Sequence, residues 1–128
     1  MACSDDTNSE MSTIAASYKV LRDGFESWKI HFMDLIDEFQ RTLDPQLILL
    51  APPVELSREQ RALLASIVLH LCMNENISPP TWSMKKNFLS KPWFVSEMQS
   101  LKAMAIKESP IAFRRNNIFV LNNFLERV

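Results

Sequence analysis

The chain has 128 residues, of which 47% are hydrophobic, a formal net charge of −1 at pH 7, two cysteines and one glycine. This length and composition predict one compact domain whose core is large enough to fold without disulfides or metals. Phosphate-binding loops, nucleophile elbows and dinucleotide-binding folds need several positions that tolerate positive φ, so a chain whose single glycine is Gly24 is not expected to contain them.

Residues 1–11 are predicted to be a disordered leader, because they carry almost no large apolar side chains. The segment is acidic and polar, and it has neither the basic start nor the apolar core of a secretory signal. No apolar run in the chain approaches the ~20 residues needed to cross a bilayer. We therefore expect a cytoplasmic protein in which Cys3 and Cys72 are reduced thiols.

Residues 12–42 are predicted to form one long helix, about 45 Å in length at ~1.5 Å per residue. The aromatic-rich face favours packing inside one bundle, and a seam shared between two copies of the chain is the alternative. Gly24, which costs about 1 kcal/mol in a helix interior, is interpreted as a close crossing of another backbone. The apolar residues that recur in steps of three and four are Met11, Ile14, Tyr18, Leu21, Phe25, Trp28, Phe32, Leu35 and Phe39.

The middle of the chain carries two further helix starts. Asp44 followed by Pro45 predicts a short helical turn that Pro52 stops. The capping-box pattern of Ser57–Gln60 leads into a second long helix over residues 61–74. This second helix is apolar on most of its circumference, so we expect it to be central in the fold.

Short elements are predicted after a domain sub-boundary near residue 80. Residues 82–91 read as an irregular or short helical connector. One helix is expected to start at Ser96, and another over Ser109–Arg115. Residues 118–121 are the one stretch with strand-like content.

These elements predict an all-α fold: residues 12–128 as a single-domain helical bundle with one long N-terminal helix, a central apolar helix and short C-terminal helices. The residues expected in its core are Leu21, Phe25, Trp28, Phe32, Leu64, Ile67, Val68, Leu71, Trp93, Phe94, Leu101, Phe113, Ile118 and Phe119.

Charge is distributed unevenly along the chain. Residues 1–80 hold six Lys and Arg and twelve Asp and Glu, whereas residues 81–128 hold eight and three. A basic C-terminal part is compatible with a nucleic-acid partner. Mutual neutralisation within the fold or across a dimer is the favoured interpretation.

Few residues are arranged for catalysis or metal binding. His31, Asp34 and Glu38 share one helix face and offer part of a metal site, but a solvated face is favoured because no partner helix supplies matching ligands. His70, with Ser66 and Asn74 one turn away on either side, is interpreted as a polar stripe rather than a catalytic base. We predict no catalytic residue, no cofactor and no metal, and expect that the protein is not an enzyme.

Cations and aromatic residues interleave over residues 82–94, which is the composition of a surface that stacks single-stranded nucleic acid. Lysines extended over core aromatics are the favoured interpretation of that segment. The paired arginines that follow Phe113 are expected to point outward, where guanidinium groups suit phosphate or carboxylate. The candidate interaction surface consists of Trp82, Lys85, Lys86, Lys91, Arg114 and Arg115.

The C-terminal third, taken as Trp82, Lys91–Ala103, Glu108–Val120 and Phe124–Val128, resembles a segment found in small bacterial proteins of unassigned function. A similar segment is appended to helix-turn-helix regulators of the Xre type. The resemblance implies a bacterial, intracellular, non-catalytic accessory module in regulatory or toxin–antitoxin-like contexts. It assigns no functional residue to this chain.

The function predicted from these observations is that of a non-catalytic protein-interaction or regulatory module, antitoxin-like or associated with a transcription regulator. The expected partner is another protein, or a second copy of the chain docked through the first helix. A nucleic-acid-associated protein that uses the basic C-terminal part is the alternative. A small-ligand-binding or enzymatic bundle, with a pocket between the two long helices, is the least favoured hypothesis.

Overall fold

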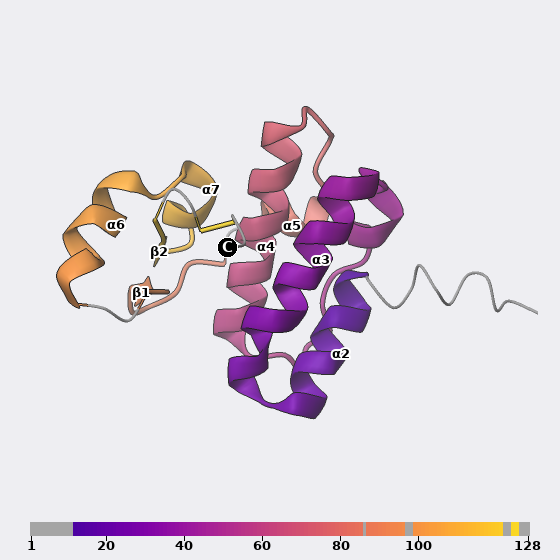
Figure 1. Cartoon of the computed structure of the whole chain (residues 1–128), viewed down its shortest axis with the longest axis horizontal. Helices are drawn as coiled ribbons and strands as arrows, with labels where there is room; N and C mark the ends of the chain where they lie inside the picture. Colours follow the sequence, from indigo (N-terminus) through magenta and orange to yellow (C-terminus); the bar gives the residue numbers. More distant parts are fainter. Residues whose placement is uncertain (1–11, 86, 97–98, 122–123, 126–128) are drawn as a thin grey trace, which may run out of the picture. The chain divides into compact units, whose positions relative to one another are not determined.

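The computed structural model describes residues 12–85, 87–96, 99–121 and 124–125 (Figure 1). Most of this described chain is helical, which confirms the prediction of a mainly α-helical protein. The chain divides into two compact units, unit 1 (Met1–Ser57) and unit 2 (Arg58–Val128), where the sequence predicted one domain with a sub-boundary near residue 80. The predicted leader, residues 1–11, lies outside the described residues.

Unit 1 is built on a helical hairpin. Helices α2 (Thr13–Asp23) and α3 (Trp28–Thr42) lie side by side and run in opposite directions, joined by the 3₁₀ turn η1 (Phe25–Ser27) (Figure 1). The prediction of one continuous helix over residues 12–42 is therefore wrong. The apolar repeat continues through the turn, so periodicity alone did not reveal the reversal.

Gly24 causes this reversal through its backbone conformation. Its φ of 105° and ψ of 162° fall in a region that is open to glycine and almost closed to other residues. Its amide donates to Val20 O at 2.8 Å, which closes the last turn of α2. No heavy atom lies within 4 Å of the place that a Cβ would occupy, so the interpretation of Gly24 as a close crossing of another backbone is wrong.

The hairpin divides the predicted apolar seam into two halves. The half on α3 is buried, as expected for Trp28 and Phe32. On α2, Tyr18 and Leu21 are exposed and Ile14 is half-buried, because a different face of this helix is buried, formed by Thr13, Ala16, Ser17 and Val20. Leu21 and Phe25, which were expected in the core, are therefore exposed.

A second 3₁₀ turn, η2 (Pro45–Ile48), follows α3 in unit 1. Asp44 caps it by accepting a hydrogen bond from the amide of Gln46 at 3.0 Å, which confirms the predicted start. Thr13 at the beginning of α2 donates its hydroxyl to Leu47 O at 3.2 Å. This bond joins residues 34 positions apart and holds the turn against the first helix.

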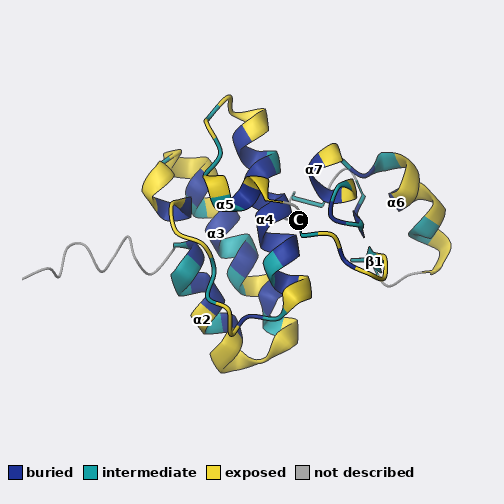
Figure 2. Ribbon diagram, turned by 180° about the vertical axis from the view of Figure 1, so that it is seen from behind, coloured by how far each residue is buried: buried dark blue, intermediate teal, exposed yellow. Residues whose placement is uncertain are grey.

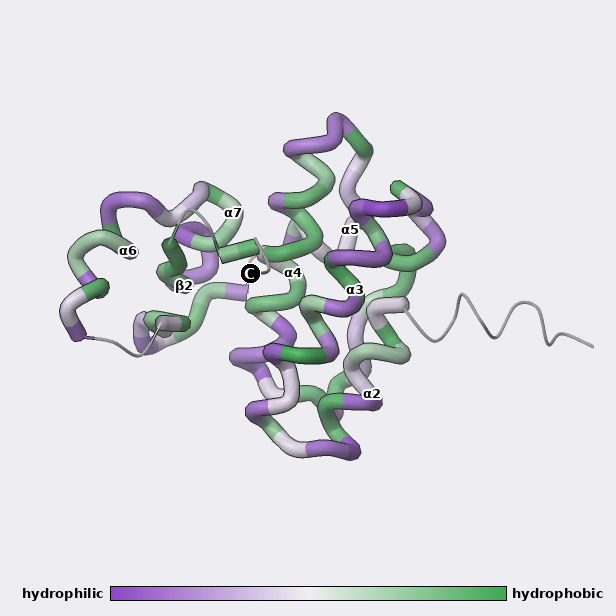
Figure 3. The backbone as a smooth tube through the Cα atoms, viewed as in Figure 1, coloured by the Kyte–Doolittle hydropathy of each residue, from purple (hydrophilic) through white to green (hydrophobic). Residues whose placement is uncertain are grey.

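Unit 2 begins with the predicted apolar helix, α4 (Arg58–Asn74), which starts directly after Ser57. Eleven of its seventeen residues are buried, and its middle is mostly apolar (Figures 2 and 3). The short helices α5 (Thr81–Met84) and α7 (Ile111–Arg114) both pack against it. A helix buried round most of its circumference is what the sequence predicted here.

The rest of unit 2 combines the 3₁₀ turn η3 (Gln99–Leu101) and helix α6 (Lys102–Glu108) with a two-stranded parallel ladder. Strand β1 (Trp93–Phe94) pairs with β2 (Ile118–Phe119), with Trp93 opposite Ile118 and Phe94 opposite Phe119. The sequence located β2, but it did not identify β1 as its partner.

Most of the remaining core predictions are confirmed. Leu101 and three aromatic residues of the ladder, Trp93, Phe94 and Phe119, are half-buried instead. No helix among the described residues is long and apolar enough to cross a membrane. The predicted core residues that are buried are Trp28, Phe32, Leu64, Ile67, Val68, Leu71, Phe113 and Ile118.

Candidate interaction surfaces

Arg114 serves as a cap for the end of α6. Its Nε donates to Ser109 O at 2.8 Å, and its Nη2 donates to Ile106 O and Lys107 O, each at 2.8 Å. The last carbonyls of a helix lack partners within the helix and carry partial negative charge, so a guanidinium is stabilising there. The side chain remains exposed, but its Nε and Nη2 both donate to the backbone.

Arg115 acts in the same way on a different helix. Its Nη2 donates to Met84 O, the last residue of α5, at 2.6 Å. The two neighbouring guanidinium groups therefore reach the ends of two different helices, Arg114 at α6 and Arg115 at α5. The residues around the pair in the sequence did not indicate this structural role.

Asn116 is a buried polar residue that follows α7. Its side-chain amide donates to Ser66 Oγ on α4 at 2.8 Å and accepts from the amide of Asn87 at 2.9 Å. Its backbone carbonyl accepts from the amide of Leu89 at 3.1 Å. The neighbouring Asn117, at a φ of 65°, donates its side-chain amide to Leu89 O at 2.8 Å. These bonds attach residues 87–89 to the end of α7.

Ser109 joins α6 to the end of β2. Its hydroxyl lies 2.5 Å from Ala105 O, to which it donates, and it accepts from the amide of Val120 at 2.8 Å. Ser109, Arg114 and Asn116 all belong to the segment that carries the family resemblance. Their hydrogen bonds lie within unit 2, so these polar residues have a structural role in its folding.

The aromatic residues of the predicted stacking segment differ in exposure. Phe94 is half-buried, stacks on Phe119 with ring centroids 5.2 Å apart, and has Lys102 Nζ at 5.2 Å from its ring. This lysine belongs to α6 and not to residues 82–94, so the contact is a cation–π pair outside the predicted segment's own lysines. Trp82 on α5 is also half-buried, whereas Phe88 is 55% exposed.

The predicted lysines of this segment are on the surface where the structure describes them. Lys85 and Lys91 are both exposed, on either side of Phe88 in the chain. Lys86 lies outside the described residues. The exposed cations of this part of unit 2 therefore accompany one exposed aromatic side chain.

Unit 1 presents an exposed apolar row that we call the α2 stripe, formed by Ile14, Tyr18 and Leu21. These residues lie at i, i+4 and i+7, which places them along one side of the helix. Tyr18 is 53% exposed and Leu21 is 40% exposed, while Ile14 is half-buried. Large apolar side chains in a row on an otherwise amphipathic helix are a common mark of a contact surface.

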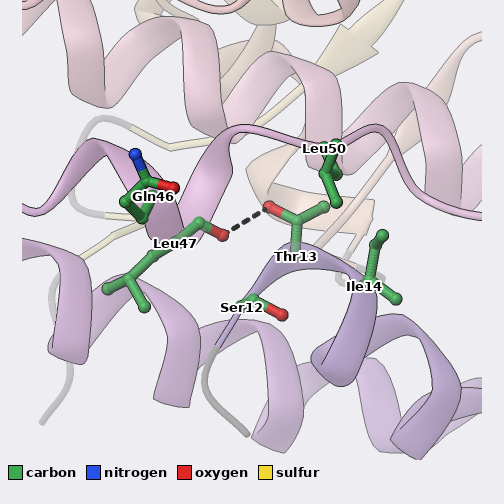
Figure 4. A pocket seen from close by; sticks show the side chains of 6 residues that line it. All are labelled: Ser12, Thr13, Ile14, Gln46, Leu47 and Leu50. Atoms are coloured by element: carbon green, nitrogen blue, oxygen red, sulfur yellow. Dashed lines mark hydrogen bonds between the residues drawn. The ribbon is translucent and has the colours of Figure 1, made fainter. Parts of the chain in front are cut away.

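A small hollow beside the first turn of α2 extends this surface (Figure 4). Ile14 and Leu50 border it together, so the apolar surface runs from α2 onto the loop after η2. Its volume of about 30 Å³ is suited to a water molecule and is far below the ~300 Å³ of a small-molecule pocket. The residues that line it are Ser12, Thr13, Ile14, Gln46, Leu47 and Leu50.

Two of the ionisable residues predicted on α3, His31 and Glu38, have separate partners. His31 Nε2 lies 2.8 Å from Asp23 Oδ2 across the hairpin turn, and Glu38 pairs with Arg41. Hydrogen bonds from Arg22 and then His31 hold the pKa of Asp23 well below its ordinary value. Within the part of the chain that the structure describes, no group of three or more His, Cys, Asp or Glu residues is placed to hold a metal ion.

The predicted polar stripe on α4 is divided between two environments. Asn74 Nδ2 lies 3.1 Å from His70 Nε2, and the His70 ring packs 5.7 Å from the ring of Phe113. Burial lowers the pKa of His70, which favours the neutral imidazole. Ser66 is fully buried, bonded to Ala62 O and Asn116. Burial also raises the pKa of the Cys72 thiol, so this cysteine is not an activated nucleophile.

Comparison with protein-family models, with curated proteins and with solved structures found no match to this chain. The resemblance of the C-terminal third to segments of Xre-type regulators therefore stays a prediction.

Proposed function

We propose that the chain is a non-catalytic protein-interaction module and that its partner docks an amphipathic helix on the α2 stripe. The observation that carries this proposal is the exposure of Tyr18 and Leu21 on a helix whose opposite face is buried. Burying such side chains on binding removes apolar area from water, at ~25 cal/mol per Å² before association costs are subtracted.

The chemistry of the α2 stripe supports a helical partner. Apolar residues at i, i+4 and i+7 match the spacing with which amphipathic helices recognise one another. Tyr18 supplies an aromatic group of the kind that dominates binding energy in protein interfaces. The exposed side chain of Leu50 widens the apolar surface beside Ile14 and gives a partner helix a second element to contact.

The setting that we propose is regulatory and cytoplasmic. The resemblance of the C-terminal third to segments of bacterial regulators supports an accessory role, either antitoxin-like or associated with a transcription regulator. In this proposal unit 1 contacts the partner, and the polar network of unit 2 has a structural role.

The test is a comparison of the wild type with a Tyr18→Ser, Leu21→Ser double variant and an Ile30→Ser control. Ile30 is 60% exposed on α3 and lies outside the α2 stripe, so the control removes exposed apolar area at another place. Each tagged full-length protein is used to capture partners from native extract at near-physiological salt. The captured protein is then purified and titrated against the same three chains.

We expect a stoichiometric protein that binds the wild type and the Ile30→Ser variant alike and binds the double variant at least tenfold more weakly. Equal binding to all three chains contradicts the proposal. A second copy of the chain is the other possible occupant of the α2 stripe. If sedimentation shows self-association that the double variant abolishes, the proposal of a different partner protein is wrong.

A further inference from the structure

Phe88 is a large aromatic side chain held at the surface of unit 2. Its side chain is 55% exposed, although the backbone amides of the residues on either side of it are hydrogen-bonded. Large exposed aromatic residues are more often found at binding surfaces than elsewhere on a protein. The groups around Phe88 decide which class of partner it can bind.

The backbone on both sides of Phe88 is anchored to one buried residue, Asn116. The amides of Asn87 and Leu89 donate to Asn116, at its side-chain and main-chain oxygens respectively. Asn116 is 1% exposed and is itself bonded to Ser66 on α4. Phe88 therefore projects from a backbone that is ordered before any partner arrives, and binding there loses little backbone entropy.

Three cationic residues accompany Phe88. Arg58 Nη2 donates to the carbonyl of Phe88 at 3.3 Å, and the Arg58 side chain is exposed. Lys85 and Lys91 are exposed and lie three residues before and after Phe88, within ~10 Å of chain on each side. Unit 2 as a whole holds ten Lys and Arg against five Asp and Glu. The surroundings of Phe88 therefore favour an anionic partner.

We propose that Phe88, with Arg58, Lys85 and Lys91, binds single-stranded nucleic acid. An unpaired base stacks on the Phe88 ring, and the cations contact the phosphates on either side of that base. An acidic peptide satisfies the cations and leaves the flat exposed ring without a matching group. A duplex holds its bases inside the stack, where the ring does not reach them. A single strand is thus the ligand that uses both features.

This inference is independent of the proposed docking of a protein on the α2 stripe, because it involves residues of unit 2 alone. It also differs from a general basic surface, because it assigns the binding to one aromatic residue. The substitution of that residue is therefore the central test.

The experiment titrates the full-length chain against a fluorescein-labelled oligothymidylate of twelve nucleotides and follows fluorescence anisotropy at several salt concentrations. We expect Phe88→Leu to weaken binding by about tenfold or more with an unchanged salt slope, since stacking is lost and phosphate contacts remain. Phe88→Trp should keep the affinity. Lys85→Gln and Lys91→Gln should each reduce the salt slope by about 0.7.

Matched controls separate the site from nonspecific effects. Ile111→Ala removes another exposed apolar side chain of unit 2, and Lys107→Gln removes an exposed charge on α6. Neither control should change the affinity as much as the corresponding site variant. Circular dichroism checks that every variant keeps the wild-type helix content.

Three results overturn the proposal. The first is an oligonucleotide that does not bind the wild type at low salt. The second is a loss of affinity in Phe88→Leu no greater than that in Ile111→Ala. The third is an oligoglutamate peptide of equal charge that binds as tightly as the oligonucleotide and depends on Phe88 to the same extent, which indicates an acidic protein segment as the ligand.

Discussion

At the residue scale, Asn116 joins α4 to the segment that precedes β1. One buried side chain bonds to α4 through Ser66 and to the segment before β1 through Asn87. A buried amide is stable only when its donors and acceptors have partners, and the same requirement applies to the groups it serves. The Phe88 site therefore depends on a residue that is itself out of reach of any ligand.

Replacing Asn116 by Ala should lower the free energy of unfolding by about 2 to 4 kcal/mol, because it leaves the Asn87 amide without its acceptor and removes the bond to Ser66. Urea denaturation followed by circular dichroism measures this change. The control is Asn74→Ala, which removes an exposed amide bonded to His70 and should cost less than about 0.5 kcal/mol. Equal costs for the two variants would show that Asn116 is not a structural node.

At the element scale, one glycine decides the architecture of unit 1. A residue with a Cβ at position 24 strains the turn, since the φ of 105° and ψ of 162° are nearly restricted to glycine. The space around Gly24 is open, so side-chain clashes make no contribution to that strain. The hairpin, and with it the exposed face of α2, therefore depends on backbone conformation at a single position.

Gly24→Ala and Gly24→Asn should both destabilise the protein by about 1 to 3 kcal/mol. Asn does not rescue, because the conformation lies outside the left-handed helical region that Asn tolerates. Thermal unfolding measures the effect, with Glu26→Ala, an exposed position in the same turn, as the control. A Gly24→Ala variant that is as stable as the wild type and has a higher helix content would mean that the continuous helix competes with the hairpin.

At the scale of the whole molecule, the two units differ in charge and in proposed partner. Unit 1 holds four Lys and Arg against ten Asp and Glu, whereas unit 2 holds ten against five. The α2 stripe lies wholly in unit 1, and the Phe88 site lies wholly in unit 2. An acidic unit with an apolar stripe and a basic unit with an exposed aromatic suit different ligands.

The two surfaces should therefore act independently. The Tyr18→Ser, Leu21→Ser variant is expected to bind the oligonucleotide with wild-type affinity, and Phe88→Leu is expected to bind the partner protein unchanged. Anisotropy and partner titrations on the same protein preparations measure both affinities. A change of more than about threefold in either crossed measurement reveals coupling between the sites, since that ratio corresponds to about 0.7 kcal/mol.

The sequence alone determined the features that depend on neighbouring residues. Asp44 and Pro45 located η2, Ser57 preceded α4, and the apolar character of α4 on most of its circumference predicted its burial. Prolines and caps act within one turn of helix, so their effect can be read from a few consecutive residues. The mainly helical class followed from the same local signals.

Tertiary structure alone decided which face of each element is covered and which group each polar side chain reaches. Ser66 and Asn116 are 50 residues apart, and Arg115 finds its acceptor at Met84, 31 residues away. The reversal at Gly24 turned Tyr18 and Leu21 outward while the repeat in the sequence continued unbroken. A local pattern records the periodicity of a helix. Which residues pack on each face of that helix depends on contacts between distant parts of the chain, and a short stretch of sequence does not specify those contacts.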